Sequence, residues 1–411
     1  MIHLLKVSNF FSIGDEITLD FDAKSGGITS PELYLNAPLD SKTTKIAFLG
    51  GPNASGKTNI LKAIAFLKEK ITTQIPAGEQ GILNFVKFLG EGPSDKSAIE
   101  TTFSMNDSCN YIYKIVFSYS RIHDEELLIT KKRKQRSSTT EIFSRHWDGA
   151  KYNVKVSNKY APNIHKIINL AELLDAGNNC LNSLIAITSN MDAPGGFLRR
   201  ISNFWNNLVA NVTFSTPNES ITLNANKILE KYAANPALRE KAEEILRQMD
   251  IGYQSIFELR PSENDAYAAF GIRHAYPNAT PFDVLIMLES TGTRRLIDIV
   301  DCIVSALSVE YGGVAVLDDM DAFIHPDLYE KLIDYFMSPS LNKNGTQLIL
   351  CSHNYATLNY LDKQQIFLVE RNDSGMTKTW RLDEVEGVQA RENFYARYLS
   401  GAYGAVPRSD R

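Results

Sequence analysis

The chain has 411 residues, 44% hydrophobic and 22% charged, which is the balance of an ordinary globular protein with room for two or three lobes. It lacks both the apolar run of ~18 residues that spans a bilayer and the features of a signal peptide, so we expect a cytoplasmic protein with no membrane contact. The formal net charge of −5 argues against a protein that coats nucleic acid with basic surface.

Residues 1–95 are predicted to form the front half of a nucleotide-binding core. Alternating apolar residues predict strands over 2–10 and 16–21. A short apolar strand over 45–50 ends in glycines, and residues 59–68 carry apolar side chains at helical spacing. The order is therefore strand, glycine-rich turn, helix.

The glycine-rich turn, Gly51 to Thr58, matches the Walker A pattern G-x-x-x-x-G-K-[ST] in full. Its glycines let backbone N–H groups wrap phosphates at a helix N-terminus, where the helix dipole favours anions. Lys57 reaches the β- and γ-phosphates and the Thr58 hydroxyl binds Mg²⁺. We therefore predict that ATP and Mg²⁺ bind here, with the nucleotide held by Gly51, Asn53, Ser55, Gly56, Lys57 and Thr58.

Two insertions are predicted in the middle of the chain. Strand-like segments predict an antiparallel β-meander over 96–158, and mainly helical patterns predict a compact lobe over 159–280. The helical lobe is too short for long coiled-coil arms and shows no sustained heptad. Its predicted helices cover 164–174, 181–190, 196–208 and 226–249.

A basic run, Lys131 to Arg136, lies between two strand-like segments of the meander. Two interpretations stay open. The run is either the solvated tip of a hairpin or a contact with nucleic acid or an acidic partner.

Residues 281–411 return to alternating helices and buried strands, which completes the core. Ser290, Gly292 and Thr293 precede a helix over 296–307 and offer a second anion site at a helix N-terminus. Alone, these residues would be an ordinary helix cap. In the order of motifs they match the signature of ABC/SMC-class ATPases, which faces the γ-phosphate bound by the opposite subunit.

Two buried strands carry the remaining candidate catalytic residues. The first, Val314–Leu317, leads into Asp318, predicted to hold Mg²⁺, and Asp319, predicted to polarise the attacking water. The second ends in His353, which matches the γ-phosphate-sensing switch histidine of ABC-type ATPases. Cys351, in the same strand, has no metal-ligating spacing and is interpreted as a buried thiol.

Three segments, 289–296, 317–326 and 348–354, resemble the ATPase subunits of bacterial abortive-infection systems: the AbiL/RloA-type, PARIS-type and OLD-family ATPases. Residues 7–12 are similar to their first strand, and residues 395–407 resemble the tail of the AbiL/RloA type. The resemblance covers roughly 1–130 and 283–407. It implies an α/β fold, with an ABC/SMC-like P-loop ATPase core split by the β-meander and the helical lobe.

The resemblance also implies partners and a function. We expect a homodimer or higher homo-oligomer that senses infection, answers a phage trigger protein and controls a separate toxin or nuclease, often of TOPRIM type. The alternative is an SMC-like ATPase that clamps or repairs DNA. The long insertion argues against a transporter subunit, and the 58 residues that follow His353 are too few for a TOPRIM domain of its own.

Two features depart from the family pattern. Aspartate stands at 319 where the family usually has glutamate, one methylene longer, so we expect slow hydrolysis. No glutamine is a secure Q-loop residue; Gln80 is the nearest candidate, although a surface role suits it better.

Overall fold

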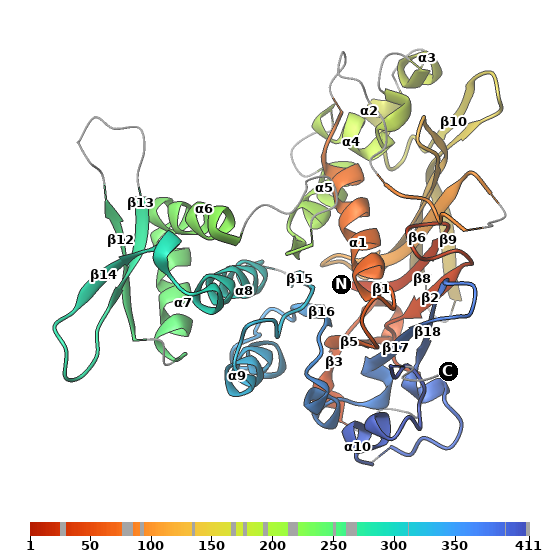
Figure 1. Ribbon diagram of the computed structural model, residues 1–411. Helices are drawn as coiled ribbons and strands as arrows, with labels where there is room; N and C mark the ends of the chain where they lie inside the picture. Colours follow the sequence, from red (N-terminus) through yellow and green to blue (C-terminus); the bar gives the residue numbers. More distant parts are fainter. Residues whose placement is uncertain are drawn as a thin grey trace.

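Two large sheets form the centre of the computed structural model, a mainly parallel sheet of six strands and an antiparallel sheet of seven (Figure 1). No helix in the described part of the chain is long and apolar enough to cross a membrane. The structure describes residues 1–24, 30–75, 85–90, 94–133, 136–165, 170–175, 179–191, 196–212, 221–249, 252–259, 269–310, 312–390 and 392–407. Gln80 lies outside them.

The mainly parallel sheet carries the nucleotide motifs. Every residue of β5, β15 and β16 is buried, as expected for parallel strands that are covered on both faces. Because these strands are parallel, the Walker A turn, Asp318 and His353 all leave the sheet at the same edge. In spatial order the strands are β11 (Val209–Ala210), β15 (Val314–Leu317), β16 (Gln347–Cys351), β5 (Ile46–Gly50), β17 (Ile366–Arg371) and antiparallel β18 (Thr377–Arg381).

Alternate residues of these strands divide the interior into two cores. Ala47 and Leu49 of β5 belong to the core shared with α1 and the antiparallel sheet. Ile46 and Phe48 belong to the core on the opposite face, with α8 and α9. The period of two in a strand sends successive side chains to opposite faces, so the one sheet serves both cores. The helices named here are α1 (Lys57–Thr72), α8 (Thr291–Leu307) and α9 (Pro326–Met337).

The antiparallel sheet contains the predicted meander. Strands β6 to β10 follow one another in space as in sequence, and β1 and β2 extend the sheet beyond β6. The spatial order is β10 (Tyr152–Val156), β9 (Arg136–Trp147), β8 (Ile122–Arg133), β7 (Cys109–Phe117), β6 (Ser97–Ser104), β1 (Ile2–Ser8) and β2 (Ile17–Asp20).

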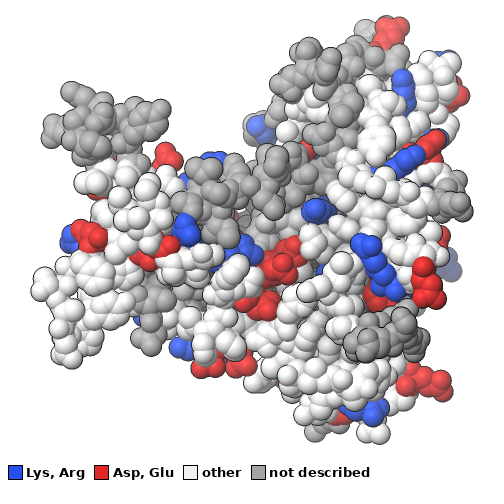
Figure 2. Space-filling view, viewed as in Figure 1, with Lys and Arg blue, Asp and Glu red and all other residues white. Residues whose placement is uncertain are grey.

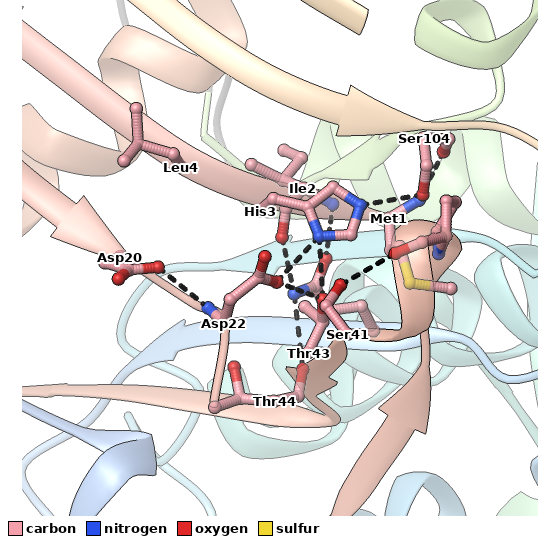
Figure 3. A network of polar contacts seen from close by, with 12 residues as sticks. Met1, Ile2, His3, Leu4, Asp20, Asp22, Ser41, Thr43, Thr44 and Ser104 are labelled. Atoms are coloured by element: carbon pink, nitrogen blue, oxygen red, sulfur yellow. Dashed lines mark hydrogen bonds and ion pairs between the residues drawn. The ribbon is translucent and has the colours of Figure 1, made fainter. Parts of the chain in front are cut away.

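A buried polar network joins this sheet to its neighbours (Figure 3). The His3 ring lies 2.7 Å from the Asp22 carboxylate through Nδ1 and 2.8 Å from the Ser104 hydroxyl through Nε2. Thr43, on β4 (Lys42–Thr44), contacts both His3 and Asp22; β4 pairs with β3 (Tyr34–Asn36) in a small two-stranded sheet. The network therefore fixes β1 against β6 and β4.

Residues 159–280 lie in two groups (Figure 1). One contains α2 (Pro162–His165), α3 (Leu170–Asp175), α4 (Leu184–Thr188) and α5 (Phe197–Asn206), of which α4 and α5 pack on α1. The other contains α6 (Ile221–Ala234) and α7 (Pro236–Arg247), which pack on α8. The second group also holds a small sheet of β12 (Tyr253–Leu259), β13 (Ala269–His274) and β14 (Phe282–Leu285).

The structure differs from the sequence analysis at two places in this region. The single helix predicted over 226–249 is broken, because Pro236 cannot continue a helix and the Asn235 side chain caps the new one. The strands β12 and β13 were not predicted; a register shift between Tyr253 and Ser255 interrupts the alternation that would have indicated β12. The bounds of the four predicted parts of the chain stay a prediction.

Candidate nucleotide site

Glycine is required at both Gly51 and Gly56 of the Walker A turn because a side chain at either position would clash with its neighbours. A Cβ on Gly51 would stand 2.0 Å from the carbonyl oxygen of Val369, and one on Gly56 would stand 2.0 Å from the Thr377 hydroxyl. Gly56 also has a φ of 109°, which L side chains rarely adopt. The helix α1 begins at Lys57, directly after this turn, so its unpaired N–H groups and its dipole face the turn.

Polar side chains from the N-terminal and C-terminal regions of the chain form hydrogen bonds that support the turn. The Thr377 hydroxyl donates to the carbonyl oxygen of Ser55 at 2.9 Å. Ser12 lies 2.7 Å from that hydroxyl and accepts a hydrogen bond from Asn59 at 2.7 Å. Ser12 is therefore a positioning residue of the turn, in the segment 7–12 that we identified only by resemblance.

Lys57 is buried and folded back on its own turn. Its Nζ donates to the carbonyl oxygens of Gly51 at 2.8 Å and Pro52 at 3.0 Å. Burial lowers the pKa of Lys57, and neighbouring groups that include Asp319 oppose this. A phosphate would replace two neutral acceptors with a charged one, and hydrogen bonds to charged groups are the stronger kind.

One pocket gathers most of the predicted residues, and we call it the nucleotide pocket. Asp319 and His353 face the Walker A turn across it, although they lie far away in sequence. Gly51 and Asp318 lie next to this lining without being part of it. The lining consists of Asn53, Ala54, Ser55, Gly56, Lys57, Thr58, Asn59, Asp319, His353 and Arg371.

The acidic edge of the pocket fits a hard cation. Potential ligand atoms of Asp318, Asp319 and Cys351 all lie within 4.8 Å of one another. Mg²⁺ prefers oxygen ligands, which Thr58 and Asp318 supply. Burial raises the pKa of the Cys351 thiol, which contacts Asp318, so the thiol is a neutral hydrogen-bond donor to that carboxylate. The register that pairs Leu317 with Leu350 would have predicted this contact.

Asp318 and Asp319 are held in different ways. The Asn211 side chain accepts from the Asp318 N–H at 2.7 Å, and both Asn211 and Arg295 donate to the Asp318 carbonyl. Asp319 has a φ of 45°. Desolvation by the surrounding atoms, and then the charge of Asp318, raise the pKa of Asp319. A raised pKa makes a carboxylate a better proton acceptor.

His353 is fixed by its backbone. Its N–H donates to both carboxylate oxygens of Asp321, at 3.0 and 3.2 Å. Its ring meets the Tyr355 ring edge to face at 6.2 Å between centroids. The ring is exposed and lines the nucleotide pocket, which is where a group that senses a terminal phosphate must be.

The second predicted anion site is separate from this pocket. Ser290 caps α8, accepting from the Thr293 N–H at 3.0 Å and lying 2.9 Å from the Thr293 hydroxyl. Ser290, Gly292 and Thr293 do not line the nucleotide pocket, and Ser290 is exposed. His274 bonds Glu289 at 2.6 Å and so steadies the residue that precedes the cap.

The sequence did not indicate Arg371, at the carboxyl end of β17. This strand pairs with β5, which places Arg371 beside the Walker A turn. Its guanidinium makes no hydrogen bond or ion pair with the described residues. Knowledge that β17 pairs with β5 would have identified Arg371, but one sequence alone does not reveal this pairing.

The sequence matches the family described as "AAA domain, putative AbiEii toxin, Type IV TA system" over residues 46–151 and 195–359. No curated protein sequence matches the chain.

Three solved structures match the chain at low TM-scores and low sequence identity. The recombination mediator RecF with ATP has a TM-score of 0.41 and 11% identity, over 92% of this chain and 99% of that one. RecF with an ATP analogue, ATPrS, has a TM-score of 0.38 and 12% identity, over 92% and 98%. A structure from work on ATP-driven dimerization and DNA-stimulated activation of SMC ATPases has a TM-score of 0.30 and 14% identity, over 45% and 99%.

The family match covers more than half of the chain, and the Walker A turn lies within it. The chain belongs to this AAA domain family and is an ATP-binding P-loop protein.

Proposed function

We propose that this AAA domain protein hydrolyses ATP between two copies of the chain. The observation that carries the proposal is the separation of the two anion sites. The nucleotide pocket gathers the Walker A residues with Asp319 and His353, whereas Ser290 caps an exposed helix N-terminus outside it. A second copy brings the missing site: α8 of one copy then faces the phosphates held by the other, and the two-fold pair has two equivalent composite sites.

Within each composite site the residues divide the work. The turn and Lys57 hold the β- and γ-phosphates, and Thr58 and Asp318 would hold Mg²⁺, which neutralises charge on the phosphates. Asp319 accepts a proton from the attacking water, and His353 contacts the γ-phosphate. Ser290 and Thr293 of the second copy complete the cage around the transferred group.

Mixing two inactive variants tests the composite site. Lys57→Ala removes the phosphate contact, and Ser290→Arg places a bulky cation on the face that meets the partner. Each variant alone should lose ATPase activity. Mixed in equal amounts, they should regain a fraction of it, because one of the two sites in a mixed pair carries neither change. No recovery in the mixture, or wild-type activity in Ser290→Arg, would overturn the proposal.

We propose further that the chain is the ATP-gated sensor or scaffold of an anti-phage defence system, in which it controls a separate toxin or nuclease. The family description, which names a toxin–antitoxin system, and the resemblance to AbiL/RloA-type, PARIS-type and OLD-family ATPases support this. Purification of the chain from its native operon, with and without infection, tests it by mass spectrometry. Co-purification of a nuclease or toxin, released or activated on infection, is the expected result; a neighbourhood without any effector contradicts it.

A DNA-clamping ATPase is the second candidate, and the hairpin between β8 and β9 favours it. Lys131, Lys132 and Arg136 lie at the described part of its tip. However, Lys132 already pairs with Asp40, and the Lys131 Nζ lies 5.1 Å from the centroid of the Tyr160 ring. On the face drawn in Figure 2, Lys and Arg are scattered among Asp and Glu. Stimulation of the ATPase by duplex DNA, lost in Lys131→Glu, would favour this candidate over the first.

A further inference from the structure

Phe323 projects from the turn that follows Asp319. It is 70% exposed, although an aromatic ring of this size normally contributes to a core or an interface. Its φ of 65° is one that phenylalanine rarely adopts. The turn also runs directly beside the start of α8, because a Cβ on Gly292 would stand 3.0 Å from the carbonyl oxygen of Phe323. The backbone of Phe323 is thus adjacent to the second anion site.

A second hollow adjoins the nucleotide pocket, and we call it the tail pocket. It shares Asn53, Ala54, Ser55, His353 and Arg371 with the nucleotide pocket, so the two open side by side. Its far side is built by the end of the chain around α10 (Phe394–Leu399). The further lining residues are Pro52, Tyr355, Glu370, Tyr398, Leu399, Ser400, Gly401, Val406 and Pro407.

The wall of the tail pocket is fixed to the Walker A turn. The Tyr355 hydroxyl accepts from the Gly51 N–H at 3.2 Å and donates to the Gly51 carbonyl at 2.7 Å. The Tyr355 ring stacks on Tyr398 at 4.3 Å between centroids, and the Tyr398 hydroxyl donates to the carbonyl of Ala405 at 2.7 Å. The tail therefore forms a preformed hollow at a fixed position beside the nucleotide pocket, with Tyr355, Tyr398, Leu399 and Val406 among its lining residues.

Two-fold symmetry relates the exposed ring to this hollow. When the start of α8 in one copy faces the phosphates in the other, the residues beside Gly292 come close to the surface around the Walker A turn of the other copy. Phe323 lies beside Gly292, and the tail pocket lies beside the turn. We propose that Phe323 of each copy inserts into the tail pocket of the other when ATP closes the pair. This inference rests on the proposed composite site and adds to it the contact that joins the tail to the partner copy.

Phe323→Asn tests the contact in solution. Asparagine tolerates a positive φ better than phenylalanine, so this variant removes the ring while it relaxes the backbone. We expect an unchanged or higher melting temperature, unchanged ATP binding by the single copy, and dimerisation in a non-hydrolysable ATP analogue that is weaker on the order of 100-fold. The expected loss of dimerisation affinity is this large because each pair of copies buries two Phe323 rings. Leu341→Asn, at a residue that is 48% exposed before the amino end of β16, is the matched control and should leave dimerisation unchanged.

Cysteine cross-linking tests the position of the ring. In a background with Cys109 and Cys180 changed to serine, Phe323→Cys is combined with Leu399→Cys, which is 60% exposed at the tail pocket. A short bis-maleimide should link the two copies only with the ATP analogue. Two kinds of control measure linking that does not depend on the proposed contact. One is the pair Phe323→Cys with Leu341→Cys, and the other is each single cysteine variant.

The outcomes separate this inference from the function on which it rests. A nucleotide-dependent dimer that forms normally with Phe323→Asn, or that fails to link 323 to 399, overturns the inference and leaves the composite site intact. A wild-type chain that stays monomeric with the analogue overturns both. If an effector protein occupies the tail pocket instead, the effector and not the second copy will link to Leu399→Cys.

Discussion

At the scale of single residues, Arg371 carries a charge for which the described part of the chain offers no partner. An arginine at a protein surface commonly lies in solvent, but this one lines the nucleotide pocket together with Lys57 and His353. A guanidinium presents a planar fork of N–H donors that suits phosphate oxygens. We therefore interpret Arg371 as a phosphate ligand in the same copy.

The substitution Arg371→Gln should weaken ATP binding by about 10- to 100-fold, because a hydrogen bond to a charged group contributes ~1.5–3 kcal/mol. Isothermal titration with ATP and with ADP measures the loss, and a larger loss for ATP assigns the contact to the γ-phosphate. Lys378→Gln removes the same charge from an exposed residue of the neighbouring strand β18 and serves as the control. Equal affinities for both variants would show that Arg371 is only a surface residue.

The backbone conformation at residue 319 explains why aspartate and not glutamate stands there. Its φ of 45° is in the left-handed region, which aspartate and asparagine tolerate better than residues with longer side chains. The backbone at this turn thus favours the shorter acid, which in the proposed mechanism shortens the reach toward the attacking water. Sequence alone identified the shorter side chain, but it could not reveal the backbone angle that explains it.

We predict slow hydrolysis in the wild type and a faster rate, by up to about 100-fold, in Asp319→Glu, because a misplacement of about 1 Å can cost that factor. Asp319→Glu should also be less stable, since a left-handed backbone costs a residue of this kind ~1–2 kcal/mol. Asp319→Asn keeps the backbone preference, loses the base and should trap the ATP-bound dimer. Single-turnover kinetics measure all three. A slower Glu variant together with an unchanged Asn variant would exclude Asp319 as the base.

The residues that sequence could identify are those whose neighbours in the chain define a motif. Lys57, Asp319 and His353 each follow a buried strand, and parallel pairing brings those strand ends together. Tyr355 contacts the same turn and Arg371 lines the same pocket, without any local pattern to distinguish them. Their roles depend on tertiary contacts, which one sequence does not supply.

At the scale of secondary structure elements, a buried ion pair ties the meander to the Walker A helix. Glu125 on β8 and Arg145 on β9 are both fully buried and lie 2.8 Å apart. The Leu184 N–H at the start of α4 donates to both Glu125 oxygens, at 3.0 and 2.9 Å. Because α4 packs on α1, this carboxylate couples the insertion to the nucleotide core.

Arg145→Met should destabilise the fold by ~3–5 kcal/mol, because it leaves the Glu125 carboxylate buried and without its cation. Adding Glu125→Met should recover part of that loss. Burial already raises the pKa of Glu125, and loss of Arg145 raises it further. The folded state of the single variant then binds a proton more tightly than the unfolded state, so its deficit should shrink as the pH falls from 7 toward about 4.3.

Urea unfolding at several pH values measures the ion-pair effect. Lys6→Met is the control, since Lys6 and Glu100 form a partly exposed pair at 3.1 Å. Its loss should cost less than ~1 kcal/mol and show no such pH dependence. A deficit in Arg145→Met that is small, or that grows as the pH falls, contradicts this account.

At the scale of the whole molecule, α1 and α8 belong to different faces of one sheet. Residues of α1 pack in the core shared with the antiparallel sheet, and residues of α8 pack in the core on the other face. The fold class followed from the order of motifs, whereas the division of residues 159–280 between these faces could not be predicted. It depends on packing across the sheet, as α6 on α8 and α4 on α1 illustrate.

This arrangement predicts two kinds of protection from hydrogen exchange when a non-hydrolysable ATP analogue binds. Amides of the Walker A turn are covered by phosphates in the same copy, so their protection should not depend on protein concentration. The first N–H groups of a helix have no intrahelical partner except through a cap such as Ser290. At the start of α8 they should become protected only when a second copy supplies the phosphates, and therefore only at concentrations where the pair forms.

In Ser290→Arg, the turn should be protected and α8 should not. Peptides from β7 are the internal control, because this strand lies in the meander. Protection of α8 that persists on dilution, or in Ser290→Arg, would mean that nucleotide acts on α8 within one copy, and the composite site would have to be abandoned.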